Sequence, residues 1–233
     1  MIPLRDTIPG RSFPFVTIAF IVANALVFLH QLGLGSVRGA AFVAAFGAVP
    51  AQFTGAAAHI APALPPVLTL GTSMFLHSGL LHLLGNMVFL WIFGNNVEDA
   101  TGHARFVLFY LVCGVAAALA HIATHPASNV PMVGASGAIS GVLGAYFLLY
   151  PHARIVTLLW LGFFAQTVRI PAFVFLGCWF VAQFLSWALL GSDGGGVAFV
   201  AHLGGFVAGM LLLIPFKQRR IRLWSPVTGL VLP

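Results

Sequence analysis

Two side chains of the sequence have the types and settings needed for acyl transfer. Ser136 lies between small residues in the segment Gly134–Gly137 and opens an apolar run that ends at Tyr150. A serine hydroxyl becomes a useful nucleophile when a neighbouring base takes its proton, and an imidazole is the usual base. His202 lies inside another apolar run and is the candidate base. The pair predicts a serine hydrolase centre, provided that two separate elements bring the residues together.

Small residues near Ser136 and near His202 suggest how two helices bring these side chains together. Around the serine, glycines recur at three- and four-residue spacings: Gly134, Gly137, Gly141 and Gly144. Beside the histidine, small residues recur at four-residue spacings: Ala201, Gly205 and Gly209. Such spacings place the small residues along one side of a helix, and small faces let two helix backbones approach closely in a membrane. We therefore expect the two helices to pack tightly and to bring His202 to Ser136.

Acyl transfer also needs hydrogen-bond donors aimed at the developing oxyanion. His82 and Asn86 are four residues apart in a third apolar run, so they share one helical face, and both carry side-chain N–H groups. The backbone N–H of Ser136, at the start of a helix, is a third candidate donor. His77 lies about 140° round the same helix from His82 and is expected to support the site.

The acidic residues favour a Ser–His dyad over a triad. The chain has only four of them: Asp6, Glu98, Asp99 and Asp193. The first three are expected at the opposite membrane face, and Asp193, nine positions before His202, is expected to lie too shallow. Ser140 lies one turn deeper than Ser136 and is the less favoured nucleophile.

No metal or cofactor is expected. The sequence has no HExxH-type motif, and His77 and His82 are five residues apart. His121 and His125 have a spacing that could hold a metal, but they lie at a helix end without a third ligand nearby. An interfacial, solvated role is the better interpretation of this pair.

The composition indicates an integral membrane protein. Of 233 residues, 60% are hydrophobic and only 6% are charged, and the mean hydropathy is +1.03. A soluble domain carries about 25% charged residues, so this chain cannot coat a water-facing surface. The basic residues lie in short connections and tails without interleaved aromatics, which argues against nucleic acid. We expect one all-α domain over residues 1–233 in the lipid bilayer.

At about 20 apolar residues per crossing, the chain accommodates six spans. They are Phe13–Leu32, Phe75–Phe93, Phe106–Ala123, Met132–Tyr150, Ala172–Leu190 and Val197–Pro215. Two further apolar runs are too short to cross. Ala40–Val49 is interpreted as an interfacial or re-entrant piece of the first loop, and Ile155–Phe164 as a segment lying along the membrane surface.

The charge distribution supports this count. Nine of the ten Lys and Arg residues fall on one side, and only Arg38 falls on the other. The asymmetry predicts a short cytoplasmic N-terminus (1–12) and a basic cytoplasmic tail (216–233). A bacterial inner membrane is expected because the sequence shows no eukaryotic-type extension. At 1.5 Å per residue, Ser136, His202 and His82 then lie roughly 6, 8 and 10 Å below the outer boundary. Polar side chains from three spans therefore share one level.

This set of residues resembles the rhomboid family of intramembrane serine proteases. The match comprises His77, His82 and Asn86 in the second span, Gly134 to Gly137 opening the fourth, and Ala201, His202, Gly205 and Gly209 in the sixth. The resemblance implies a six-helix core, with Ser136 as nucleophile and His202 as general base and acid. It implies oxyanion stabilisation by His82 and Asn86, and cleavage of membrane-anchored proteins near the outer membrane face. Glu98 resembles the structural acid that the family carries after the second span.

Two positions depart from the family pattern. Some members have a tyrosine, stacked on the histidine, where this chain has Ser140, so the imidazole must be oriented by other neighbours. Many members carry a Trp-Arg pair in the first loop, and none precedes His77 here. The rival interpretation is a non-catalytic protein, either a rhomboid-like binder or a small transporter. A transporter is expected to show internal repeats and a pseudoprotease to lack the serine or histidine, and the sequence fits neither expectation.

Overall fold

A bundle of six helices dominates the computed structural model, which describes residues 2–56, 64–162, 164–190 and 198–224. The bundle helices are α1 (Phe15–Gly33), α5 (Leu80–Thr101), α6 (His103–Thr124), α7 (Ser136–Leu149), α8 (Ala172–Leu190) and α9 (Phe199–Phe216). Five of them are long and apolar enough to cross a membrane, and α7 is a shorter apolar helix of 14 residues. The polytopic helical bundle predicted from the sequence is confirmed.

The outer faces of the bundle are apolar, as contact with lipid requires. On α5, exposed hydrophobic side chains recur at three- and four-residue spacings: Leu81, Leu84, Val88 and Trp91. On α8 they include Phe173, Val181 and Phe184. Contiguous exposed apolar surface on this scale marks a membrane or protein interface.

Helix α7 is the centre of the bundle. Ten of its 14 residues are buried, and it packs against α5, α6, α8 and α9. The glycine faces meet as expected: a β-carbon added at Gly205 or Gly209 would overlap with the backbone carbonyl of Gly137 or Gly141. Only glycine permits this approach of α9 to α7, and the approach brings the first turns of the two helices together.

Two helices begin four or five residues later than predicted. The second span was predicted to start at Phe75, but α5 starts at Leu80, so His77 precedes the helix rather than lying within it. The Gln31 side chain explains this difference. Its amide accepts from the His77 N–H (3.1 Å) and donates to the His77 carbonyl (3.2 Å), which replaces the helical hydrogen bonds of that residue.

The fourth span was predicted from Met132, but α7 starts at Ser136. Met132 instead pairs with Ala48 through two backbone hydrogen bonds of 2.8 and 3.1 Å. Gly134 then takes a φ of +120°, a conformation that glycine adopts without strain and that interrupts a helix. Ser136 is therefore the first residue of its helix rather than the fifth residue of a longer span.

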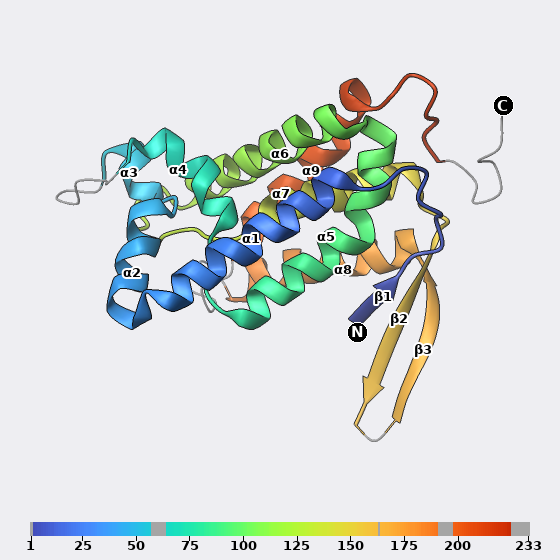
Figure 1. The fold of residues 1–233 in the computed structure, drawn as a ribbon, viewed down its shortest axis with the longest axis horizontal. Helices are drawn as coiled ribbons and strands as arrows, with labels where there is room; N and C mark the ends of the chain where they lie inside the picture. The colour runs from blue at the N-terminus through green and yellow to red at the C-terminus, as the bar shows by residue number, and fades with distance from the viewer. Residues whose placement is uncertain (1, 57–63, 163, 191–197, 225–233) are drawn as a thin grey trace.

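The connections at the serine end contain short helices. These are α2 (Gly35–Phe46), α3 (Pro50–Thr54), α4 (Pro66–Thr72) and the 3₁₀ turn η1 (Ser73–Phe75). Figure 1 shows α2, α3 and α4 gathered at one end of the bundle, away from the strands. The Ala40–Val49 segment, predicted to be interfacial or re-entrant, supplies most of α2 and the extended residues after it.

A small antiparallel sheet lies at the other end. It consists of β1 (Ile2–Arg5), β2 (Arg154–Leu161) and β3 (Phe164–Pro171), in the order β1-β2-β3. The Ile155–Phe164 run is therefore mainly one strand of a β-hairpin with β3, a regular structure that the sequence analysis missed. The hairpin projects away from the helices from the connection between α7 and α8 (Figure 1).

Acidic residues at the end of α5 hold the N-terminal segment at this same end. The Glu98 carboxylate accepts hydrogen bonds from the backbone N–H groups of Val16 (3.0 Å) and Thr17 (2.8 Å), and so caps α1. Asp99 accepts from the backbone of Arg11 (2.6 Å) and Ser12 (3.1 Å). These contacts agree with a structural role for Glu98. Asp193 and residues 225–233 of the predicted tail lie outside the described residues.

Candidate active site

Ser136 and His202 meet at the end of the bundle opposite the sheet. Ser136 is the first residue of α7, and His202 lies in the first turn of α9. The distance between Ser136 Oγ and His202 Nε2 is 2.8 Å, a hydrogen bond between a hydroxyl and an imidazole nitrogen. The structure thus brings together the two residues that the sequence analysis paired across 66 positions.

A residue that the sequence analysis missed contacts the other side of the imidazole. The His202 Nδ1 lies 2.6 Å from Oε1 of Gln183 on α8. Because an amide oxygen can only accept, this contact assigns the proton to Nδ1 and leaves Nε2 as the acceptor facing Ser136. Trp179, one turn before Gln183, places its ring 6.0 Å from the imidazole at an angle of 35°. Position 140 is a serine, so no tyrosine there can orient the His202 ring. Helix α8 supplies neighbours that orient it instead.

His82 lies directly against the segment that precedes the serine. A β-carbon added at Gly134 would lie 2.8 Å from His82 Nε2 and 3.6 Å from Ser136 Oγ, so the imidazole, the glycine and the hydroxyl are immediate neighbours. His82 Nδ1 lies 3.0 Å from the hydroxyl oxygen of Ser78. If this hydroxyl donates, the ring proton of His82 is on Nε2, the nitrogen next to Gly134.

Asn86 and His77 complete the group from α5 and the residues before it. The Asn86 side-chain nitrogen donates to the His82 carbonyl (2.9 Å), which uses one of its two N–H groups. The His77 ring packs edge-on against His82, with 5.1 Å between ring centroids. Both ring nitrogens of His77 are buried without a hydrogen-bond partner among the described residues. His77 therefore packs against His82 and makes no side-chain hydrogen bond to Ser136.

Ser140 bonds back to its own helix. Its hydroxyl donates to the Ser136 carbonyl (2.6 Å), and the residue is only 1% exposed. This is the common behaviour of a serine within a helix. It agrees with the preference for Ser136 as the candidate nucleophile.

A cavity of about 1360 Å³ opens over these residues. It is lined by Ser136, His202, His82, Asn86, Trp179 and Gln183, together with the loop that precedes α7. Small-molecule sites usually measure about 300–1,000 Å³, so this space can hold a short stretch of polypeptide. His121 and His125 also line it, with their rings stacked 4.4 Å apart. Among the residues that the structure describes, no three His, Cys, Asp or Glu side chains are placed to hold a metal ion.

Taken together, the fold and the site define a polytopic helical membrane protein with a hydrogen-bonded serine–histidine pair in a cavity near one end of the bundle. The model of the rhomboid domain matches residues 65–219, and the chain belongs to the rhomboid family. The matched segment runs from α4 to the residues after α9, so it contains all the residues of the site.

Several relatives support this membership. The chain is 31% identical over 150 residues to Rhomboid protein 1, mitochondrial, of Saccharomyces cerevisiae, covering 60% of this chain and 39% of the yeast protein. It is 44% identical over 79 residues to Rhomboid protease GluP of Bacillus subtilis, covering 34% and 15%. It is 29% identical over 220 residues to RHOMBOID-like protein 4 of Arabidopsis thaliana, covering 86% and 52%. The matches thus span about half or less of the length of these relatives.

Proposed function

We propose that this protein is an intramembrane serine endopeptidase that uses a Ser136–His202 dyad. The observation that carries the proposal is the 2.8 Å hydrogen bond between Ser136 Oγ and His202 Nε2, with the proton of the imidazole assigned to Nδ1. Such a pair is the minimal arrangement in which a base activates a serine hydroxyl. The name of the protease GluP, a family member, agrees with this chemistry.

In the proposed mechanism, His202 Nε2 takes the hydroxyl proton as Ser136 Oγ attacks the carbonyl carbon of the scissile peptide bond. The tetrahedral intermediate collapses to an acyl-enzyme, and His202 gives the proton to the leaving amine. Water then attacks the ester with His202 as the base, which releases the acid product and restores the serine. No cofactor takes part in these steps.

Three donors are positioned for the oxyanion. They are the Nε2–H of His82, the second N–H of the Asn86 amide and the backbone N–H of Ser136, which has no intrahelical acceptor because it begins α7. Donors of this kind typically contribute about 10²–10³ each in kcat. Gln183 has a positioning role: its amide oxygen accepts the hydrogen bond from Nδ1–H of His202 and stabilises the imidazolium that forms.

The proposed substrates are membrane proteins, cleaved where a segment unwinds near the serine end of the bundle. The cavity there is lined by polar side chains and is large enough to admit water, which lipid does not supply. We further propose that the opposite, basic end is cytoplasmic, because nine of the ten Lys and Arg residues lie on that side. Fusions of green fluorescent protein to either terminus would then fluoresce, whereas alkaline phosphatase fusions would be inactive.

Cleavage of a membrane-anchored reporter in proteoliposomes tests the proposal. Ser136→Ala and His202→Ala should each abolish cleavage, whereas Ser140→Ala, the same change one turn away, should retain it because the Ser140 hydroxyl bonds only to its own helix. Cleavage by the Ser136→Ala protein would refute the mechanism. Reporter binding without cleavage by wild type would favour the non-catalytic binder.

A further inference from the structure

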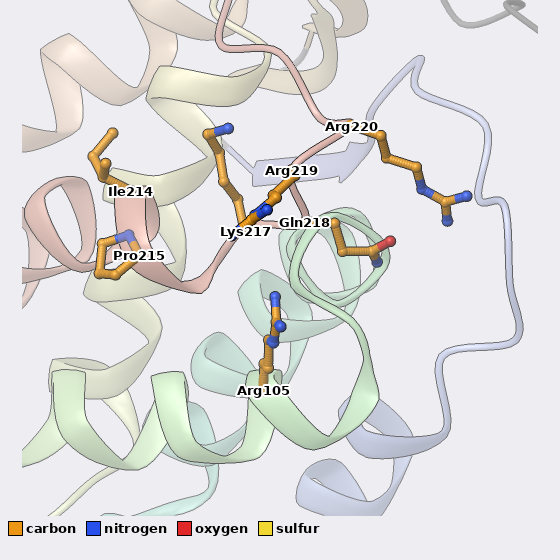
Figure 2. Close-up of a pocket in the computed structure, with 7 residues that line it drawn as sticks. All are labelled: Arg105, Ile214, Pro215, Lys217, Gln218, Arg219 and Arg220. Atoms are coloured by element: carbon orange, nitrogen blue, oxygen red, sulfur yellow. The ribbon is translucent and has the colours of Figure 1, made fainter.

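A second polar site lies at the sheet end of the bundle, between the start of α6 and the end of α9. This pocket of about 850 Å³ is lined by Arg105, Ile214, Pro215, Lys217, Gln218, Arg219 and Arg220. In Figure 2, Arg105 reaches from α6 toward the segment that carries Lys217 and Arg219, whereas Arg220 points away from them. Four basic residues therefore line one pocket, far along the helices from Ser136.

The segment after α9 has a fixed position. The backbone N–H of Gln218 donates to the Ala100 carbonyl (2.9 Å), and its side chain donates to the Asp99 carbonyl (3.0 Å). Lys217 Nζ donates to the carbonyl of Ile221 (2.8 Å), whose side chain is only 6% exposed. The pocket is thus built by contacts to the end of α5 and does not consist of a loose basic tail.

Most of the positive charge in this pocket is uncompensated. Within the described part of the chain, the side chains of Arg105, Arg219 and Arg220 make no ion pair or hydrogen bond. Arg105 also lies in the first turn of α6, where the helix dipole disfavours a cation. Guanidinium groups that line one pocket without a carboxylate repel one another, and a bound anion would relieve this repulsion.

The pocket also has an apolar wall. Ile214 is 53% exposed and, with Pro215, belongs to the last turn of α9, where this span leaves the lipid. A ligand at this position meets hydrocarbon on one side and guanidinium groups on the other. A phospholipid with a charged headgroup has the same arrangement, whereas a free ion would leave the apolar wall unused.

We propose that this pocket binds the phosphate headgroup of an anionic glycerophospholipid, with its acyl chains running along Ile214 and the outside of α9. Arg105 and Arg219 are the principal ligands, because a guanidinium fork matches two phosphate oxygens at once. Basic pockets between membrane helices are established sites for such headgroups. The inference depends on the membrane fold and not on the proposed peptidase activity.

Native mass spectrometry of delipidated protein, titrated with phosphatidylglycerol in detergent, measures this binding directly. The test variant is the double substitution Arg105→Gln with Arg219→Gln. The matched control is Arg154→Gln with Arg169→Gln, which removes the same charge from the exposed hairpin at the same end. The gel-filtration profile and thermal unfolding in detergent check that both variants remain folded, and therefore separate loss of the lipid site from loss of the fold.

Phosphatidylglycerol should bind wild type and the hairpin control within about twofold of each other, because the hairpin charges act only through screened, long-range attraction. The pocket variant should bind at least about tenfold more weakly, because the charge-assisted hydrogen bonds of two guanidinium groups are lost. Equal weakening in both variants would show a general charge effect and overturn the proposal. The proposal would also be overturned if wild type bound phosphatidylcholine as tightly as phosphatidylglycerol. The same holds if inorganic phosphate bound the pocket as tightly as phosphatidylglycerol and displaced it, because the site would then be an anion site with no preference for a lipid.

Discussion

The imidazole of His202 lies between the side chains of Ser136 and Gln183. Substitution of Gln183 offers the sharpest test at the residue scale. Gln183→Leu removes the acceptor of the Nδ1 proton, so the ring is free to adopt the wrong tautomer or to rotate away from Ser136. Loss of such an outer partner typically costs about 10–100-fold in activity. We expect this loss in kcat with little change in KM. Gln183→Glu, which keeps an acceptor oxygen, should recover most of the rate, and an unchanged kcat in Gln183→Leu would contradict the positioning role.

Gly134 sets the distance between His82 and the serine. Gly134→Ala forces a side chain into a φ of +120° and places its β-carbon 2.7 Å from His82 Cε1, so the histidine must move. A displacement of about 1 Å at a catalytic group costs about 100-fold, and we expect a loss of that size in reporter cleavage. Gly85→Ala, at a cavity position where an added β-carbon meets nothing within 4 Å, is the control. Equal activities of the two variants would refute the account of Gly134.

The sequence identifies four of these side chains but not Gln183 or Trp179. Ser136, His202, His82 and Asn86 stand out because polar groups at one depth in apolar runs are costly. Gln183 is equally polar, but the sequence of the fifth span does not indicate whether its side chain contacts lipid headgroups, another helix or the site. The available signal was its four-residue spacing from Trp179, which places both on one face of α8.

At the level of elements, the contact of α7 with α9 should depend on glycine. Gly209→Ala inserts a methyl group into the Gly141 backbone, and overpacking of this kind costs typically about 1–3 kcal/mol. Gly177→Ala on α8 meets nothing within 4 Å and should instead stabilise its helix slightly, by about 0.5–1 kcal/mol. Thermal unfolding in detergent compares the two. A melting temperature of Gly209→Ala equal to that of wild type would show that the two backbones are not in contact.

Element boundaries were predicted least well, for local physical reasons. Hydropathy places Phe75–Gly79 and Met132–Ala135 in spans because each segment opens an apolar run. In the structure, however, the backbone of His77 bonds to the Gln31 side chain, and the backbone of Met132 bonds to that of Ala48. Such long-range hydrogen bonds leave no periodic signal. The hairpin had a signal that was missed: two runs containing Val, Ile and Thr flank a glycine at position 162.

At the scale of the whole molecule, Asp6 links three elements at the sheet end. It follows β1, and its Oδ2 accepts from Asn96 of α5 (2.7 Å) and from the Tyr146 hydroxyl of α7 (2.5 Å). Burial raises the pKa of the Asp6 carboxyl to about 6, although the hydrogen bond from the Tyr146 hydroxyl partly opposes the shift. The folded protein therefore binds more protons than the unfolded chain between about pH 4 and pH 6.

Because the pKa of Asp6 is higher in the folded state, its contribution to stability decreases as the pH rises through this window and is fully lost above about pH 6. Asp6→Asn keeps an acceptor oxygen but does not titrate. The free energy of unfolding of wild type minus that of Asp6→Asn should therefore fall as the pH rises from about 4 to about 6 and then level off, which unfolding of both proteins in denaturant at several pH values would measure. Parallel pH profiles for the two proteins would contradict the buried carboxyl account.

The overall architecture was the most predictable property. Apolar runs of membrane length and a one-sided distribution of Lys and Arg gave six crossings, and the six bundle helices match them within a few residues at most boundaries. Composition and length constrain a membrane bundle strongly, because lipid permits few alternatives. The basic pocket was not predictable, because it requires the exact path of the chain after α9.

Labelling by a fluorophosphonate tests the central claim, that His202 activates Ser136, most directly. Purified protein in detergent is treated with the probe, and the modified residue is mapped by mass spectrometry in wild type, Ser136→Ala, His202→Ala and the Ser140→Ala control. We predict modification at Ser136 in wild type and in Ser140→Ala, and none in the other two variants. Modification that persists in Ser136→Ala, or that proceeds at the wild-type rate in His202→Ala, would contradict the dyad.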